Sequence, residues 1–242
     1  MSLTSRILAL AVPAFAALLA HPLMLLADTF IVGRLGTLPL AGLSIGSGLL
    51  LTVVGLSIFL AYGSTAVVAR HVGAGRTRRG LEMGVQAMWV GAAMGAVLAL
   101  VMWPTAPWLA AGLGAGPDVA PYAVDYLRWS LPGLPGMLVM LGATGTFRGL
   151  SDARTPLVLS IAVAGLNLLL NVVLVFGAGM GIAGAALGTA IAETLLGLTA
   201  ALLVTRQARR QGARLAPSWT DMRHSLMVGF PLWLRTVTLR AA

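Results

Sequence analysis

Long uncharged runs constrain this chain more than any other feature. The runs without Asp, Glu, Lys or Arg are 7–27, 35–69, 83–117, 129–147, 155–192 and 194–205. A helix needs about 20 apolar residues to cross roughly 30 Å of hydrocarbon, so runs of this length predict membrane-spanning helices. Composition agrees, because 58% of the 242 residues are hydrophobic and only 10% are charged, too few to cover a soluble fold.

The runs divide into an expected six-transmembrane-helix bundle. Glycines at 177, 179, 181 and 184 break the longest run as a tight turn, because glycine accepts backbone angles that other residues resist. We therefore predict an all-α membrane protein, with a seventh helix starting near Ser225 and a first span too long to be a cleaved signal. The expected helices are 7–33, 42–69, 83–104, 127–147, 155–176 and 182–205. The glycines spaced for close helix contact are Gly42, Gly46, Gly48, Gly91 and Gly95.

The arginines predict how the chain crosses the membrane. Most lie near the N-terminus or in the loops after the second, fourth and sixth helices, whereas Arg34 and Arg128 lie on the other side. The positive-inside rule then makes the N-terminus cytoplasmic in a multi-pass plasma-membrane protein. The net charge of +9 is explained by topology and contact with the lipid bilayer, and we expect no nucleic-acid partner.

Enzyme chemistry has no support in the sequence. There is no cysteine, no Walker loop and no His-Glu-x-x-His. We therefore expect no enzyme activity, no cofactor and no metal.

A weak internal similarity predicts that the bundle is one half of something larger. The segment Leu10–Pro13 opens the first span, and Val228–Pro231 stands in the same position after Ser225. Many transporters are built from such repeats. We expect a six-helix lobe over 1–215, with a cytoplasmic linker and the truncated start of a second repeat over 216–242.

Two acids, Asp28 and Glu193, fall within the expected spans. An ionisable group in hydrocarbon is costly, so each is a functional candidate. His21 and Met24 lie seven and four residues before Asp28, on the same helical face. The alternatives are an Asp28 wetted by headgroups, a His21 that only packs, and a Glu193 that is ion-paired or protonated without a transport role.

Two polar pairs repeat a helical spacing of four. Asn167 and Asn171 share one helix face, and Thr189 and Glu193 share another, so these groups could meet in a common interior. The alternative is that they join helices by hydrogen bonds, worth about 0.6 kcal/mol each. If Asp28 lines a cavity, a proton on it removes the cost of closing a dry bundle around a charge. The residues that could form an apolar ligand wall, although they more often pack, are Met24, Phe30, Phe59, Tyr62, Met137 and Met140.

Three motifs, in order along the chain, resemble a known family. They are D-T-F-I-V-G-R-L-G at 28–36, F-R-G-L-S-D-A-R-T-P at 147–156, and the stretch from Asn167 to Thr189. Together they resemble the N-terminal half of a multidrug and toxic compound extrusion (MATE) transporter, and are most similar to the DinF-like bacterial branch.

The resemblance implies twelve helices in two lobes, located in the bacterial inner membrane. It also implies secondary active efflux of organic cations or amphiphilic drugs by antiport with protons or sodium. The implied coupling site is Asp28, Asn167, Asn171 and Thr189, with His21, Met24 and Glu193 as additional polar lining. Asn171 stands where the family has an acid, so a proton is expected rather than sodium.

Other classes remain open. One is a non-transporting fragment, or a half-subunit that needs a partner lobe or a second copy in a homodimer. Another is a lipid-linked saccharide flippase of related fold, which is less favoured because no arginine lies mid-span in the first six expected helices.

Overall fold

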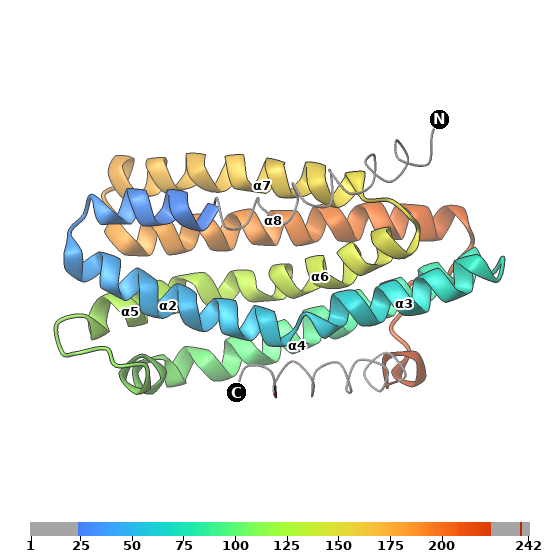
Figure 1. Ribbon diagram of the computed structural model, residues 1–242, viewed down its shortest axis with the longest axis horizontal. Helices are drawn as coiled ribbons and strands as arrows, with labels where there is room; N and C mark the ends of the chain where they lie inside the picture. The colour runs from blue at the N-terminus through green and yellow to red at the C-terminus, as the bar shows by residue number, and fades with distance from the viewer. Residues whose placement is uncertain (1–23, 224–237, 239–242) are drawn as a thin grey trace. The chain divides into compact units, whose positions relative to one another are not determined.

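The computed structural model describes residues 24–223 and 238, and its regular elements are helices, with no strand among the described residues (Figure 1). The all-α prediction is confirmed. The helices are Met24–Gly33, α2 (Thr37–Leu56), α3 (Phe59–Gly73), α4 (Thr77–Gly112), α5 (Ala120–Ser130), α6 (Leu134–Gly149), α7 (Arg154–Val172) and α8 (Gly181–Arg210). A 3₁₀ turn, η1 (Leu131–Gly133), joins α5 to α6, and a π-helical turn, η2 (Val173–Gly177), extends α7.

Four continuous helical segments of the described chain are long and apolar enough to cross a membrane. They are Thr37–Gly73, Thr77–Gly112, Arg154–Gly177 and Gly181–Arg210, and the apolar helix Met24–Gly33 is the described part of the first expected span. The fourth expected span is present as α5, η1 and α6, with Pro132 inside the 3₁₀ turn. Residues 1–23 and the seventh helix expected near Ser225 lie outside the described residues.

Several helices extend beyond their expected ends. α4 begins at Thr77 rather than 83 and continues past Pro104 and Pro107 to Gly112, and α8 continues to Arg210 rather than 205. The expected ends were set by charge and by proline. Charged side chains can leave the hydrocarbon while the backbone stays helical, and a proline removes one backbone hydrogen bond without necessarily ending a membrane helix.

The chain packs as two compact units. The first, named here the site unit, contains 1–52, 96–134 and 157–195, and the second, the linker unit, contains 53–95, 135–156 and 196–242. Within the site unit, a Cβ at Gly42 would clash with Tyr122, and one at Gly46 would clash with Tyr126. These glycines therefore let α2 and α5 approach closely, as predicted.

Glycines also set the packing of the linker unit. A Cβ at Gly91 of α4 would clash with the Leu138 backbone of α6, and one at Gly145 of α6 would clash with Ala61 of α3. The contact role predicted for Gly91 is confirmed, whereas Gly48 meets nothing within 4 Å and its predicted role is wrong. In lipid, the hydrophobic effect does not hold helices together. Small residues instead allow the close backbone contacts that stabilise their packing.

The turn between α7 and α8 follows the glycine pattern. η2 ends at Gly177, and Gly179 and Gly181 have positive φ angles of 67° and 58°, which strain other residues. A Cβ at Gly184 would clash with Leu174, so α8 lies directly against the end of α7. The tight turn predicted here is confirmed, and it makes α7 and α8 antiparallel neighbours in the site unit.

Candidate functional site

The α7–α8 pair carries a buried polar network. Asn167 and Asn171 lie one helical turn apart on α7, and both are fully buried. The Asn167 Nδ2 donates to Thr189 Oγ1 of α8 at 2.9 Å, and the Thr189 hydroxyl donates to the Ala185 carbonyl at 3.0 Å. The two asparagines therefore face the same neighbour, as their spacing predicted.

Asp28 joins this network from the helix Met24–Gly33. Its residue surface is only 2% exposed, so the alternative of an acid wetted by headgroups is wrong. The Asn171 Nδ2 donates to Asp28 Oδ1 at 2.5 Å and to Asn167 Oδ1 at 3.3 Å. A continuous chain of hydrogen bonds thus runs from Asp28 through both asparagines to Thr189. Their role in coupling stays a prediction.

One oxygen of the network has no hydrogen-bond partner among the described residues. It is the buried Asn171 Oδ1, because both donor contacts of this side chain come from its Nδ2. Gly188 of α8 leaves the room for it, since a Cβ at Gly188 would clash with this oxygen. A buried acceptor without a donor costs about 1–3 kcal/mol, so the site presents an oxygen that a proton donor or a cation can satisfy.

Glu193 lies in the same unit, one turn beyond Thr189 on α8, and is 6% exposed. Its charge acts on Asp28, and no hydrogen bond to its carboxyl forms within the described chain. Tyr126 of α5, 3% exposed, interacts electrostatically with both acids. Sequence reasoning missed Tyr126, because the fourth span was expected to begin at 127. The amphipathic pattern of residues 120–130 is the signal that could have identified it.

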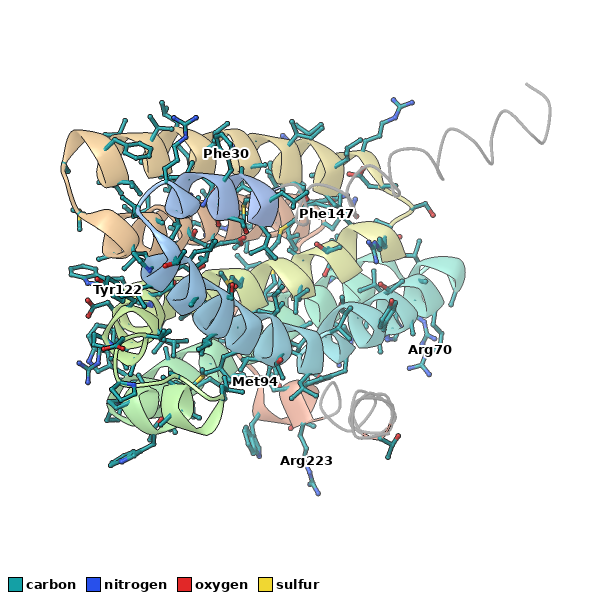
Figure 2. The ribbon with its side chains drawn as sticks, turned by 60° about the vertical axis from the view of Figure 1, so that its left-hand side comes forward. Phe30, Arg70, Met94, Tyr122, Phe147 and Arg223 are labelled. Atoms are coloured by element: carbon teal, nitrogen blue, oxygen red, sulfur yellow. The ribbon has the colours of Figure 1, made fainter. Side chains whose placement is uncertain are left out.

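The remaining residues predicted to line the site differ in how far they are buried. Met24 is buried at 6% exposure, one turn before Asp28, whereas His21 lies outside the described residues. Among the apolar wall residues, Phe30 and Tyr62 are 66% and 54% exposed. Figure 2 shows Phe30 on the outside of its helix, where its ring lies 4.9 Å from the Arg34 guanidinium carbon. These two aromatics do not line the buried site.

The polar atoms of the described site are carboxyl, amide and hydroxyl groups. Among the described residues, no group of three His, Cys, Asp or Glu side chains is placed to hold a metal ion. The buried polar residues of the described site unit include no arginine, lysine or histidine. A charged Asp28 therefore has an amide donor but no fully buried basic side chain beside it among the described residues.

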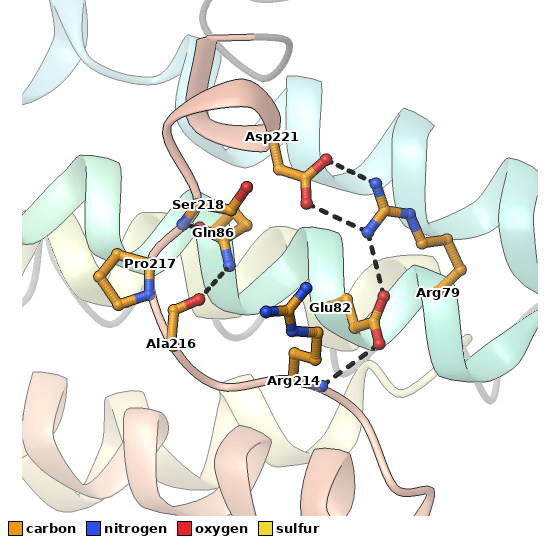
Figure 3. Close-up of a pocket in the computed structure, with 8 residues that line it drawn as sticks. All are labelled: Arg79, Glu82, Gln86, Arg214, Ala216, Pro217, Ser218 and Asp221. Carbon is orange, nitrogen blue, oxygen red and sulfur yellow. Dashed lines mark hydrogen bonds and ion pairs between the residues drawn. The ribbon is translucent and has the colours of Figure 1, made fainter.

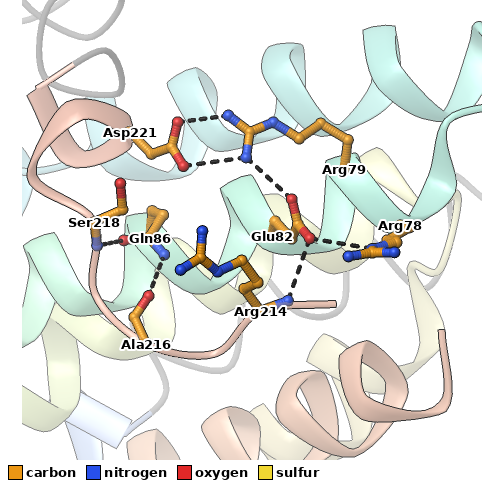
Figure 4. A network of polar contacts seen from close by, with 8 residues as sticks. All are labelled: Arg78, Arg79, Glu82, Gln86, Arg214, Ala216, Ser218 and Asp221. Atoms are coloured by element: carbon orange, nitrogen blue, oxygen red, sulfur yellow. Dashed lines mark hydrogen bonds and ion pairs between the residues drawn. The ribbon is translucent and has the colours of Figure 1, made fainter. Parts of the chain in front are cut away.

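The linker unit holds a second polar cluster, named here the α4 clasp. Arg79 of α4 forms a bidentate ion pair with Asp221 at 2.5 and 3.1 Å, and also contacts Glu82 at 3.0 Å (Figure 3). Glu82, 7% exposed, receives a further bond from Arg78 at 3.3 Å (Figure 4). Glu82 is a third buried acid, which sequence reasoning missed because the helix was expected to begin at 83.

The clasp holds the segment after α8 by its backbone. The Gln86 side chain donates to the Ala216 carbonyl at 3.0 Å and accepts from the Ser218 N–H at 2.9 Å. The Arg214 N–H donates to Glu82 at 3.2 Å, and these residues line a pocket of about 210 Å³. The two buried polar side chains of the clasp, Glu82 and Gln86, therefore have partners inside the chain, which indicates a structural role.

Apolar helices around a buried polar site define this chain as an integral membrane protein with a candidate internal binding site. The large apolar side chains on α7 support this class, because Val158, Ile161 and Leu169 are 64%, 58% and 60% exposed. A family model, MatE, matches residues 13–173. The chain belongs to this family, the MATE multidrug transporters.

Curated relatives agree with the assignment. The chain is 28% identical over 229 residues to the probable multidrug resistance protein NorM of Idiomarina loihiensis, covering 91% of this chain and 49% of that protein. It is 28% identical over 236 residues to the DNA damage-inducible protein F of Escherichia coli, covering 96% and 51%. The chain therefore spans about half the length of the curated relatives it matches.

Solved structures show the same fold. The chain matches a MOP superfamily transporter from Pyrococcus furiosus with a TM-score of 0.84 at 23% identity, covering 97% of this chain and 53% of that one. It matches a MATE structure in the bent conformation with a TM-score of 0.85 at 23% identity and the same coverage. The predicted bundle, one lobe of a larger fold, agrees with this likeness.

Proposed function

We propose that this chain is the N-terminal lobe of a cation-coupled antiporter that exports organic cations or amphiphilic drugs, with a proton as the coupling ion. The observation that carries the proposal is the buried network from Asp28 through Asn171 and Asn167 to Thr189. It contains one carboxyl and no basic group within the described site unit. Multidrug resistance is what the NorM relative is named for, and the export of drugs is here part of the proposal.

The network gives exchange a physical basis. An ionised Asp28 buried in this bundle needs a positive partner, and either a proton or an organic cation supplies one. The two compete for a single negative charge, so loading one releases the other. A proton is favoured over sodium because Asn171, an amide, occupies the position beside Asp28 and leaves the network with a single carboxylate.

A complete transport cycle in this proposal needs a second lobe. Residues 1–215 form the six-helix lobe and 216–242 the cytoplasmic linker to the next repeat, with the N-terminus in the cytoplasm of a bacterial cell. The second lobe is the following half of a longer chain, a partner chain or a second copy of this one, since alternating access moves one half against the other. Arg70 and Arg223 extend from the linker unit (Figure 2), and labelling of Arg76→Cys from the cell exterior would contradict this topology.

The experiment measures binding and efflux separately. The purified chain in liposomes is titrated with ethidium, a fluorescent organic cation, and then tested for ethidium efflux driven by a pH gradient. Asp28→Asn tests the site, and Asp118→Asn, an exposed loop acid of the same unit, is the matched control. We expect binding that Asp28→Asn abolishes and Asp118→Asn preserves.

The efflux measurement then distinguishes between the possible sources of the second lobe. Asp28-dependent binding with efflux means that two copies of the chain suffice for transport. Asp28-dependent binding without efflux means that the second lobe is not supplied by another copy of these 242 residues. Binding by a folded chain that is equal in wild type and Asp28→Asn would overturn the proposed site.

A further inference from the structure

We propose that Glu193 is a second cation-accepting carboxyl of the Asp28 site, so that the site holds two exchangeable positive charges and accepts dicationic ligands. The inference rests on the proposed function and extends it from one charge to two. Its starting point is the position of Glu193, one helical turn from Thr189, which is itself hydrogen-bonded to Asn167.

The burial of Glu193 demands a partner that the described chain does not supply. Its surface is 6% exposed, and it forms no hydrogen bond within the described residues. Glu82 provides the contrast, because this acid of the linker unit, which also has little exposed surface, binds two arginines and a backbone N–H. A bare buried carboxylate is costly, so Glu193 holds a proton or binds a ligand cation.

The charged surroundings of Glu193 support a shared site. Asp28 comes from the first described helix and Tyr126 from α5, and each interacts electrostatically with Glu193. The described parts of α2, α4 and α7 in this unit carry no titratable side chain. On α5, Asp125 is exposed, and Arg128 is only partly buried and is not among the groups acting on either acid.

The unpartnered Asn171 oxygen is the independent observation that points to a ligand. It is fully buried and belongs to the side chain that donates to Asp28. The site therefore offers a carboxyl at each end and a free amide oxygen near Asp28. An ionised carboxyl without a counter-charge is costly in a dry site, and the repulsion between two such charges adds to the cost. In this proposal the site without ligand therefore carries one proton on each acid, and each ligand charge displaces one.

The test counts protons. The purified chain in lipid is titrated in weak buffer with a monocation, ethidium, and with a dication, propidium, and the protons released per bound ligand are measured. Wild type is expected to release about one and about two protons respectively, because each ligand charge replaces one proton. Glu193→Gln is expected to release one proton with either ligand and to bind propidium at least about tenfold more weakly, having lost one charged partner.

Two further variants keep the result decisive. Glu193→Asp retains the carboxyl and is expected to restore the second proton, which separates a chemical role from a packing role. Asp28→Asn tests the proposed function itself, and its failure to change ethidium binding would overturn that proposal first. Ethidium binding that depends on Asp28, combined with propidium affinity and proton release unchanged in Glu193→Gln, would overturn this inference alone.

Discussion

Three buried acids lie in two regions of this molecule, and the two regions provide them with different partners. In the α4 clasp, Glu82 receives bonds from Arg78, from Arg79 and from a backbone N–H. In the site unit, Asp28 has one amide donor and Glu193 has none within the described residues. All three are less than 9% exposed, so burial alone does not tell a structural acid from an exchangeable one.

The difference lies in the partner. Arginine is a permanent cation whose planar fork binds carboxylates in a fixed geometry, so the clasp is locked in one arrangement. A carboxyl surrounded by amides, hydroxyls and a phenol has no fixed counter-charge, so it can take up and release a mobile one. Under the proposed function, a buried acid with no resident cation among the described residues belongs to the binding region, whereas a buried acid with arginine partners belongs to a structural one.

The largest expected effect concerns Asp28, the acid that the proposed function makes exchangeable. Asp28→Asn removes the negative charge while keeping the shape of the side chain, and should weaken ethidium binding by about 100-fold or more, since a buried charged contact is lost. The thermal midpoint should not fall, because no ion pair breaks within the described chain. A fall in stability with binding preserved would place Asp28 in the same structural class as Glu82.

Glu82→Gln should give the opposite pattern. It leaves Arg79 with one acid instead of two and weakens the bond to the Arg214 N–H, so the free energy of unfolding should fall by about 2 kcal/mol. Thermal unfolding of the purified chain gives the change, with Asp118→Asn as control. Ethidium affinity should stay within about twofold, and a larger loss would mean that the two regions are coupled.

Gly188→Ala tests the geometry of the site without changing its charge. The added methyl clashes with Asn171 Oδ1 and displaces the amide that donates to Asp28. Ethidium affinity should fall about tenfold, the equivalent of about 1.4 kcal/mol. Gly165→Ala on α7 is the matched control, because its new Cβ meets nothing within 4 Å. Equal effects of the two substitutions would contradict the close fit at Asn171.

The smallest expected effect concerns the clasp. Arg79→Lys keeps the charge but loses the bidentate contact with Asp221, so the unfolding free energy should fall by about 1 kcal/mol or less for this partly exposed pair. Amide hydrogen exchange in 214–221 should become faster. Arg70→Lys, an exposed arginine of the same unit, serves as control and should leave the exchange unchanged.

Sequence reasoning succeeded where the relevant signal was local. Apolar runs longer than the bilayer core predicted the helices, and the spacing of four predicted that Asn167 and Asn171 share a face. It failed at Glu82 and Tyr126, which each lie one residue before the expected start of a helix, because charge was taken to stop a helix. Backbone hydrogen bonding extends helices past the hydrocarbon, and the sequence of one segment does not show where that extension ends.

The amino-acid sequence by itself determined the membrane class, the helices and the presence of acids in apolar surroundings. The tertiary structure alone decided which partner each acid has. Asp28 meets Asn171 across 143 residues, and Glu82 meets the Arg214 backbone across 132. Helix periodicity is a short-range property of the backbone, whereas these pairings depend on how distant segments pack. Gly188 shows this for the Asn171 side chain, because its missing Cβ leaves the room that this amide occupies.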